Sequence, residues 1–192
     1  MLHDVRVRVD AQRNRDRILE AARSLVAETG VDATMEDIAR HAGVAVGTLY
    51  RHFPAKEDLV AAVVEDSLAQ MASLTEGALA AVHAGAPPGA AIGELFREIA
   101  ERHATDQAFK SAAGRLDVNA EIAAAAPGSP IARSVAAISE LLERAQIAEQ
   151  IRGDLTLADL GVLLAAVPGA GVAPEQRARF VDIVIAGLAA PP

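Results

Sequence analysis

Residues 34–53 read TMEDIARHAGVAVGTLYRHF, and this stretch decides the fold. Thr34 is a residue type that caps helices, and Asp37 three positions later completes a pair resembling a capping box. The pair predicts a short helix over 35–41. Gly43 then supplies the backbone freedom for a sharp turn. The first half of the stretch is therefore a short helix followed by a reversal of the chain.

The second half of the stretch predicts another short helix, over 46–52. Pro54 limits this helix because the residue before a proline disfavours the helical conformation. Two short helices joined by a three-residue turn form a helix-turn-helix motif. The major groove of B-DNA is about 12 Å wide and admits one α-helix. The motif thus points to double-stranded DNA as a partner.

The second short helix has an inward and an outward face. We expect Leu49 and Phe53, with Ile38 of the preceding helix, to pack the helices together. The remaining residues offer a phenol, a hydroxyl, a guanidinium and an imidazole, which suit phosphates or base edges. These outward residues are Ala45, Val46, Gly47, Thr48, Tyr50, Arg51 and His52.

The rest of the chain predicts an all-α fold. It contains 44 alanines, the best helix former, and only 3% aromatic residues. Apolar residues recur at helical spacing between clear loops at 84–89 and 127–130. The period-2 run Val5–Val9 is compatible with a strand, but it has no partner strand, and a loose basic arm fits better. The further helices are expected over 11–29, 56–83, 90–105, 131–150, 156–167 and 174–188, with an uncertain piece over 106–126.

Composition excludes several classes of function. The chain has no cysteine, so disulfides, thiolate zinc sites and iron–sulfur clusters are excluded. No metal-ligand spacing, nucleophile elbow or glycine-rich phosphate loop occurs, and we expect no metal, cofactor or catalytic residue. The uncharged stretch 160–174 contains glycines and a proline, and the N-terminus has no apolar signal-like run. We therefore expect a cytoplasmic protein without a membrane partner.

The net charge of −8 at pH 7 argues against a nucleic-acid partner when taken alone. It divides unevenly, however. Residues 1–56 carry nine Arg and Lys against eight Asp and Glu, and residues 57–192 carry nine against eighteen. The acidic part should discourage nonspecific adhesion to DNA, so we expect nonspecific binding to be weak and readily lost with salt.

Residues 43–59, GVAVGTLYRHFPAKEDL, resemble the signature of TetR-family transcriptional regulators. Gly30, Thr34 and the pair Ile38-Ala39 also stand where that family has them, so the similarity spans about residues 13–60. The segment LLERA at 141–145, followed by Ile151, Arg152, Asp154 and Leu155, is similar to one branch of the family. It carries no ligand assignment.

The resemblance implies three parts. These are a basic N-terminal arm over 1–12, a helix-turn-helix DNA-binding domain over 13–56 and a helical ligand-sensing and dimerisation domain over 57–192. It implies a ligand-responsive repressor that binds a palindromic operator as a homodimer, with an unidentified small-molecule effector. Two alternatives stay open: a regulator controlled by a protein partner, and an all-α enzyme that retains a vestigial helix-turn-helix.

The resemblance also implies roles for single residues. Phosphate contacts fall to Thr34, Tyr50, His52 and Lys56, and base-edge contacts to Val46, Gly47 and Thr48, with Arg51 as a further candidate. Arg6 and Arg8 could enter a minor groove or belong to a free tail. Many family members have lysine where this chain has Val46, and Ala45 and Ala55 lack the oxygen that would cap the following helix.

In the C-terminal part, candidate ligand residues are Met71, Phe96, Ile99, His103 and Phe109, each of which could equally be ordinary core. The family resemblance implies dimerisation through the last two helices, packed as a four-helix bundle. Two apolar stripes agree with it. They comprise Leu157, Leu160, Leu164 and Val167, and Phe180, Val184 and Leu188.

Overall fold

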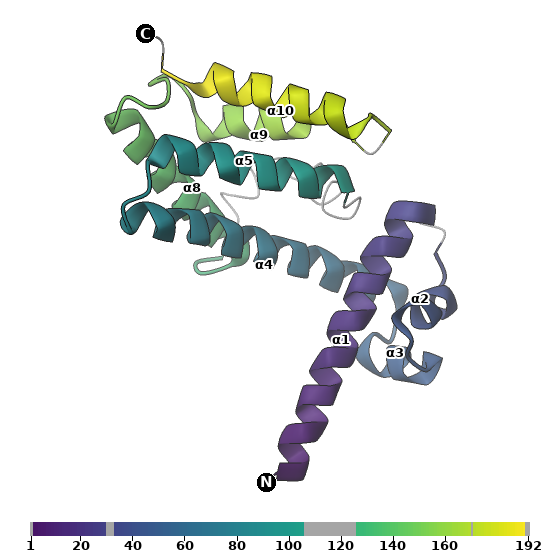
Figure 1. The fold of residues 1–192 in the computed structure, drawn as a ribbon. Coiled ribbons are helices and arrows are strands. Elements are labelled where there is room, and N and C mark those ends of the chain that lie inside the picture. The colour runs from purple at the N-terminus through teal and green to yellow at the C-terminus, as the bar shows by residue number, and fades with distance from the viewer. Residues whose placement is uncertain (1, 30–32, 106–125, 170, 191–192) are drawn as a thin grey trace. The chain divides into compact units, whose positions relative to one another are not determined.

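The computed structural model describes residues 2–29, 33–105, 126–169 and 171–190, without the side chains of 2–9, 26–29 and 103–105. Within these residues the fold is all-α, as the sequence predicted, and one isolated antiparallel bridge joins Ile151 and Ala189. The predicted piece over 106–126 lies almost entirely outside the described residues. The helices are α1 Leu2–Thr29, α2 Met35–Ala42, α3 Val46–His52, α4 Lys56–His83, α5 Pro88–Thr105, α8 Pro130–Ile147, α9 Leu157–Ala165 and α10 Pro174–Leu188 (Figure 1).

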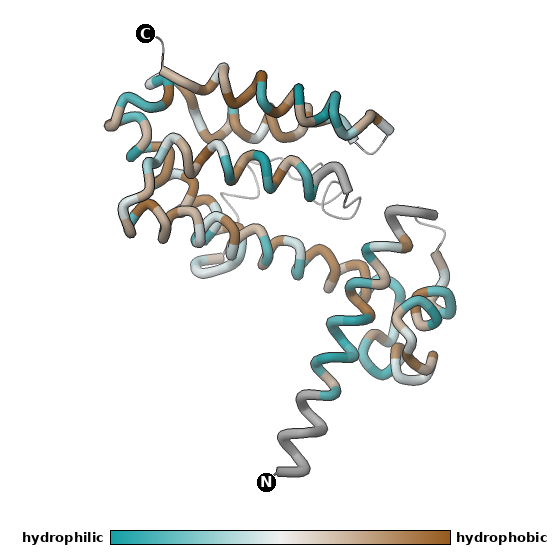
Figure 2. Tube along the Cα trace, in the orientation of Figure 1, coloured by the Kyte–Doolittle hydropathy of each residue, from teal (hydrophilic) through white to brown (hydrophobic). Residues whose placement is uncertain are grey.

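The start of the first helix differs from the prediction. Helix α1 begins at Leu2 rather than at Ala11, so the expected loose arm is helical and continuous with the rest of α1. No glycine or proline precedes Gly30, and nothing in the sequence therefore interrupts the helix once it forms. Figure 2 shows a mostly hydrophilic stretch in α1, which is residues 10–17.

The chain divides into two compact units, and the division falls inside α4. The first unit extends to Asp66 and the second begins at Ser67. The sequence placed the boundary at Lys56, the first residue of α4. The division falls later because the first turns of α4 belong to the first core, where Leu59, Ala62 and Val63 are buried.

The core of the first unit joins α1, α2, α3 and the start of α4. Ile38 and Phe53 are 2% exposed and Leu49 is completely buried, as expected from the sequence. They share one cluster with residues of α1 such as Ile18 and Ala22. Short helices such as α3 are marginal alone, so tertiary packing through Leu49 is what holds it.

Helix α5 is central to the second unit. Ile92, Leu95 and Ile99 pack with α8 and α9 in one cluster, and Phe96 packs with Val167 and with α10 in another. An α-helix can contribute to two cores when apolar residues occupy two adjacent faces. Ile92, Leu95, Phe96 and Ile99 of α5 are thus all buried.

Two side-chain pairs fix α4 against α8. Arg133 donates two hydrogen bonds of 2.8 Å to the carboxylate of Glu76, and His83 Nε2 lies 2.9 Å from Oε1 of Glu140. Each pair joins residues 57 positions apart, so the two helices run in the same direction and in constant register. The hydrogen bonds from Arg133 lower the pKa of Glu76, and those from His83 and Arg144 lower the pKa of Glu140.

Backbone conformation and local hydrogen bonds mark the end of α8 and the start of α9. Helix α8 ends at Ile147, before the predicted residue 150, and Glu149 adopts a left-handed φ of 55°. Gln150 then turns back, and its Oε1 accepts a 2.7 Å hydrogen bond from the backbone N–H of Gly89. Thr156 and Asp159 form a capping box at the start of α9.

Candidate nucleic-acid interface

Thr34 caps α2. Its Oγ1 accepts a 3.2 Å hydrogen bond from the backbone N–H of Asp37 and donates a 2.6 Å hydrogen bond to Oδ2 of the same residue. The bond from Thr34 and the charge of Arg40 lower the pKa of Asp37. The hydroxyl proton of Thr34 is therefore used within the protein, and a phosphate contact by this proton would have to replace the bond to Asp37.

The turn between α2 and α3 centres on Gly43. This residue has a φ of 63°, the left-handed conformation that favours glycine, and its N–H closes the end of α2. Nη2 of Arg17 on α1 donates a 3.2 Å hydrogen bond to the Gly43 carbonyl oxygen. The turn is thus held both by its own backbone and by a guanidinium from α1.

Helix α3 presents an outward face of mixed chemistry. Leu49 is buried, whereas Val46 and Tyr50 are 39% and 42% exposed. Gly47 and Arg51 are also exposed, while Thr48 and His52 are half-buried. The side chains assigned to DNA on α3 therefore all retain access to solvent, and Leu49 is the residue that the helix buries.

Both ends of α3 lack strong side-chain caps. Ala45 stands at its N-cap position and makes no side-chain hydrogen bond, as its missing oxygen predicts. At the other end, the guanidinium carbon of Arg15 lies 5.0 Å from the centroid of the Phe53 ring. A cation over an aromatic face stabilises by about 0.5–1 kcal/mol at exposed sites, so α1 supports this end of α3 as well.

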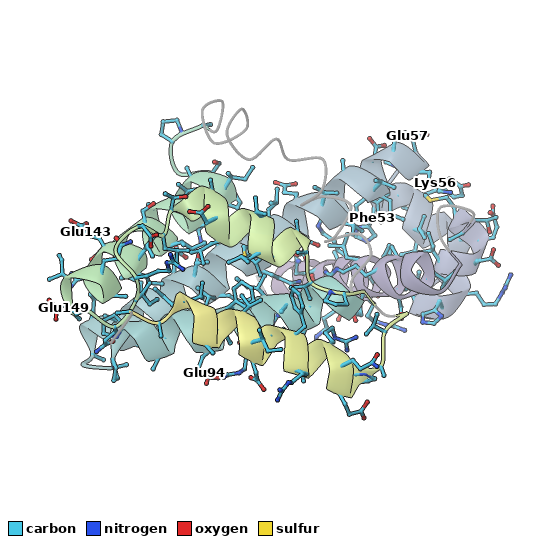
Figure 3. The ribbon with its side chains drawn as sticks, turned by 90° about the horizontal axis from the view of Figure 1, so that it is seen from above. Phe53, Lys56, Glu57, Glu94, Glu143 and Glu149 are labelled. Carbon is cyan, nitrogen blue, oxygen red and sulfur yellow. The ribbon has the colours of Figure 1, made fainter. Side chains whose placement is uncertain are left out.

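Lys56 is the first residue of α4 and is half-buried. The preceding residue, Ala55, has no side-chain cap to offer, but its backbone N–H donates a 3.0 Å hydrogen bond to Oδ2 of Asp58. Phe53, Lys56 and Glu57 are labelled at the junction of α3 and α4 (Figure 3). Lys56 thus follows the last residue of α3, His52, by four positions in the chain.

The sequence missed the roles of Arg15 and Arg17. Three arginines at positions 13, 15 and 17 were visible as a basic run, but their alternation gives no indication of which side chain contacts another helix. The structure places Arg15 at the end of α3 and Arg17 at the end of α2. Helix C-termini carry partial negative charge, which favours a nearby guanidinium.

The candidate ligand residues lie in the cores of the second unit as far as they are described. Phe96 and Ile99 are each 3% exposed, and Met71 packs against the cluster that contains Ile99. The side chain of His103 and the whole of Phe109 lie outside the described residues. The prediction of a pocket lined by these five residues therefore stays a prediction.

The candidate dimer residues divide into two groups. Leu160, Val167 and Leu188 are 6%, 2% and 4% exposed within one chain, so they have little surface to offer a second copy. The partly buried group comprises Leu157, Leu164, Phe180 and Val184. The same two helices expose apolar side chains that the stripes did not include, Val162 on α9 at 69% and Ile183 on α10 at 58%.

A cavity of about 450 Å³ lies beside α9 and α10, lined by residues that include Leu163 and Val184. Its charged side chains are already engaged. Arg152 donates hydrogen bonds of 2.6 and 2.7 Å to Asp154, and Asp159 belongs to the cap of α9. None of the candidate ligand residues lines this cavity, which is why it does not replace the predicted pocket.

In the part of the chain that the structure describes, no group of three or more acidic or histidine side chains could hold a metal ion. No helix among the same residues is long and apolar enough to cross a membrane.

A short, groove-sized helix with an exposed face of mixed chemistry, held by two neighbouring helices, defines a helix-turn-helix DNA-binding protein. Two family models match the chain and identify the family within this class. Residues 18–63 match the model of bacterial regulatory proteins of the tetR family, and residues 87–190 match the C-terminal domain of SbtR-like transcriptional regulators. The chain belongs to the TetR family of transcriptional regulators. Since members of this family are regulators without enzymatic activity, the all-α enzyme alternative is not supported.

Solved structures agree over almost the whole chain. A TetR transcription regulatory protein from Mycobacterium vanbaalenii is 36% identical, with a TM-score of 0.68 over 95% of this chain and 99% of that one. The TetR regulator SCO0520 from Streptomyces coelicolor is 32% identical, with a TM-score of 0.67 over 93% and 99%. CprB from the same organism, solved with its biological operator sequence, is 25% identical, with a TM-score of 0.66 over 94% and 90%.

Curated relatives match over about a third of the chain. An HTH-type transcriptional regulator from Staphylococcus aureus strain USA300 is 46% identical over 63 residues. That match covers 32% of this chain and 34% of the relative. The chain thus matches about one third of the length of these relatives, and their function as a whole does not transfer through this match.

Proposed function

We propose that this DNA-binding regulator is a repressor that binds a palindromic operator as a homodimer and is released by a small-molecule effector. The proposed contact with operator DNA is supported by the exposed outward face of α3. Leu49 is fully buried, while Val46 and Tyr50 on the same seven-residue helix stay exposed. An exposed phenol and an exposed apolar side chain beside a turn held by Arg17 fit a surface that is covered by DNA.

The proposed DNA contacts are of two kinds, to backbone phosphates and to base edges. Tyr50, His52 and Lys56 bind backbone phosphates, and Arg51 adds a further cation. Val46, Gly47 and Thr48 approach the base edges, where Val46 can contact a thymine methyl group and Thr48 either a base or a phosphate. Thr34 acts chiefly as the cap of α2, because its hydroxyl proton is bound to Asp37.

The proposed dimer uses the exposed apolar side chains of α9 and α10. Val162 and Ile183 are the large apolar residues that these two helices expose most among the described side chains. Partly buried Leu164, Phe180 and Val184 would surround them. Leu160, Val167 and Leu188 instead support the same helices from inside the chain. A two-fold dimer reads two half-sites, which accounts for a palindromic operator.

The proposed effector binds the second unit and favours a dimer state whose recognition helices are wrongly spaced for the operator. The effector can shift the equilibrium between the two dimer states only if it binds them with different affinities. The match to an SbtR-like C-terminal domain supports a sensing role for this unit. Control by a protein partner is the alternative, and it predicts that no small molecule alters operator affinity. The regulator acts in the cytoplasm, where the operator DNA lies.

The test measures binding to labelled DNA from the protein's own upstream region by fluorescence anisotropy across a salt series. Lys56→Ala should weaken binding to this DNA and to unrelated DNA alike, and should reduce the salt slope by about one. Thr48→Ala should instead relax the preference for one base position.

Arg144→Ala is the matched control, because it also removes one exposed positive charge but from the last turn of α8. We expect this variant to keep the wild-type salt slope. Equal slopes for Lys56→Ala and Arg144→Ala would contradict the phosphate contact, and equal losses for Thr48→Ala on all operator variants would contradict the base contact.

A further inference from the structure

The residues of α3 divide into a buried side and an outward side. Leu49 lies on the side that faces the core and is completely buried. At about 100° per residue, Gly47 and Arg51 fall close to the opposite side of the helix, and both are exposed. Each flank of the outward side consists of two residues one turn apart, Val46 with Tyr50 and Thr48 with His52.

The flank that Val46 and Tyr50 form is apolar and accessible to solvent. The two side chains are 39% and 42% exposed. Residues four positions apart are neighbours on a helix, with about 5–6 Å between their Cβ atoms. The isopropyl group of Val46 and the ring of Tyr50 therefore present adjacent apolar surface, and the hydroxyl of Tyr50 is the polar tip of this flank.

Gly47 leaves the centre of the outward side open. No atom lies within 4 Å of the position that a Cβ on Gly47 would take. Because Gly47 has no side chain, the backbone of α3 can come close to a surface that lies over this residue. A close approach of the backbone brings a short side chain such as that of Val46, one residue earlier, within reach of base edges.

The first turn of α3 has no side chain that pairs with a base through two hydrogen bonds. Arginine and lysine pair in this way with guanine, and asparagine and glutamine with adenine, while carboxylates accept from cytosine. Residues 46–48 are Val, Gly and Thr, and a threonine hydroxyl does not select one base. Within α3, bidentate donors for guanine belong to Arg51, in the last turn, whereas recognition helices contact base edges mainly with their first residues.

An apolar side chain in the major groove has one kind of partner on the base edges. The methyl group at C5 of thymine is the apolar group that the base pairs present there. Val46 gains free energy on leaving water when it packs against this methyl group, and it gains little beside a polar base edge. Cytosine lacks the methyl group, so contact with Val46 distinguishes the two pyrimidines.

We propose that α3 distinguishes its operator chiefly through thymine methyl groups that pack against Val46. The inference rests on the proposed function, which supplies the operator contact, and adds the chemical group by which the bases are told apart. Each half-site then has an A·T pair beside the first turn of α3. A cytosine methylated at C5 carries the same group and should substitute for thymine at that position.

The test starts from the sequence that the full chain selects out of a random duplex library. Each thymine of the selected site is replaced in turn by deoxyuridine in both half-sites, which removes the methyl group and keeps the base pair. Fluorescence anisotropy at one salt concentration measures affinity. We expect one position at which affinity falls by about fifteenfold, since burial of one methyl group in each half-site contributes about fourfold.

Val46→Ala should abolish the effect of the methyl group. In this variant the same deoxyuridine should lower affinity by less than about twofold, because the methyl group has lost its partner. Val60→Ala is the matched control, since it shortens a valine that is 48% exposed on α4, and it should keep the full loss. The wild-type chain should bind a site with 5-methylcytosine at this position more tightly than a site with cytosine.

Replacement of guanine by 7-deazaguanine tests the competing contact, because it removes the N7 acceptor that an arginine such as Arg51 uses. Larger losses on 7-deazaguanine than on deoxyuridine, or a deoxyuridine loss that persists in Val46→Ala, would overturn the inference. A selected site without thymine would do the same. A library that yields no enriched sequence would instead contradict the proposed operator binding itself, so the two failures are distinguishable.

Discussion

Arg17 on α1 donates a hydrogen bond of 3.2 Å from Nη2 to the carbonyl oxygen of Gly43, in the turn between α2 and α3. Gly43 is in the left-handed region at a φ of 63°. A Cβ added to Gly43 would lie 2.6 Å from the same Nη2 atom. Gly43 thus meets two requirements. It adopts a backbone conformation that favours glycine, and it leaves room for the Arg17 side chain of α1.

Gly43→Ala should lower the free energy of unfolding by about 1–2 kcal/mol, since a left-handed alanine is strained and Arg17 must move away. Urea unfolding followed by circular dichroism measures this change. Arg17→Ala should lower the free energy of unfolding by less in the Gly43→Ala background than in the wild type, because the hydrogen bond from Arg17 to Gly43 is already disturbed. Full additivity of the two substitutions would contradict the coupling.

Gly47→Ala should have the opposite effect on stability. Gly47 lies in α3 and no atom is within 4 Å of the position that an added Cβ would take, so alanine should keep or raise the stability by up to about 1 kcal/mol. If α3 enters the major groove, the added methyl group lies between the helix and the bases. We expect operator affinity to fall by about fivefold or more, near 1 kcal/mol. Wild-type affinity would show that Gly47 does not approach DNA closely.

Val162→Asp and Ile183→Asp should convert the dimer to a monomer. Each places a charge on an apolar side chain that is more than half exposed in one chain, where a dimer would bury it. Sedimentation velocity measures the mass in solution. Ile147→Asp is the control, because Ile147 is 76% exposed at the end of α8. A dimer that persists in both α9 and α10 variants would place the interface elsewhere.

The parts of the fold that the sequence predicted correctly have strong local signals. The helix-turn-helix follows from a cap at Thr34, a glycine at the turn and Pro54 after α3, and each of these acts within a few residues. The start of α1 has no such signal, because only the absence of glycine and proline allows the helix to begin at Leu2. The prediction of its N-terminus was accordingly wrong.

The apolar periodicity of α9 and α10 is not enough to identify a dimer interface. An apolar stripe identifies which face of a helix is covered but not what covers it. Leu160 and Val167 satisfy the stripe because their own chain buries them, whereas Val162 lies off the stripe and is exposed.

The ion pair of Arg177 and Glu101 predicts an asymmetry between two substitutions. Arg177 is 7% exposed at the side chain and Glu101 is 65% exposed. Glu101→Ala removes this partner from a buried guanidinium and should cost about 1–2 kcal/mol, less than for a fully buried pair because Glu101 is largely exposed, whereas Arg177→Met fills the space and should be nearly neutral. Urea unfolding of both variants checks the difference, and equal losses would contradict it.

The cap of α9 predicts a dependence on pH. Hydrogen bonds from Thr156 lower the pKa of Asp159, so the folded state favours the ionised carboxylate. A lowered pKa contributes stability above the ordinary aspartate range, and this contribution is lost as the pH falls through the lowered value. Asp159→Ala should therefore be less stable than the wild type at pH 7, and the difference should shrink below about pH 4. A difference that is constant from pH 7 to pH 3 would contradict this role.

The weak ends of α3 have a consequence for the thermodynamics of recognition. The helix has seven residues, no side-chain cap at Ala45, and Leu49 as the side chain that it buries. Its amide hydrogens should exchange with solvent at a lower opening free energy than those of α1 or α4. Operator DNA would then complete the ordering of α3, and binding would carry an unfavourable conformational entropy that a stronger cap, such as Ala45→Ser, should reduce.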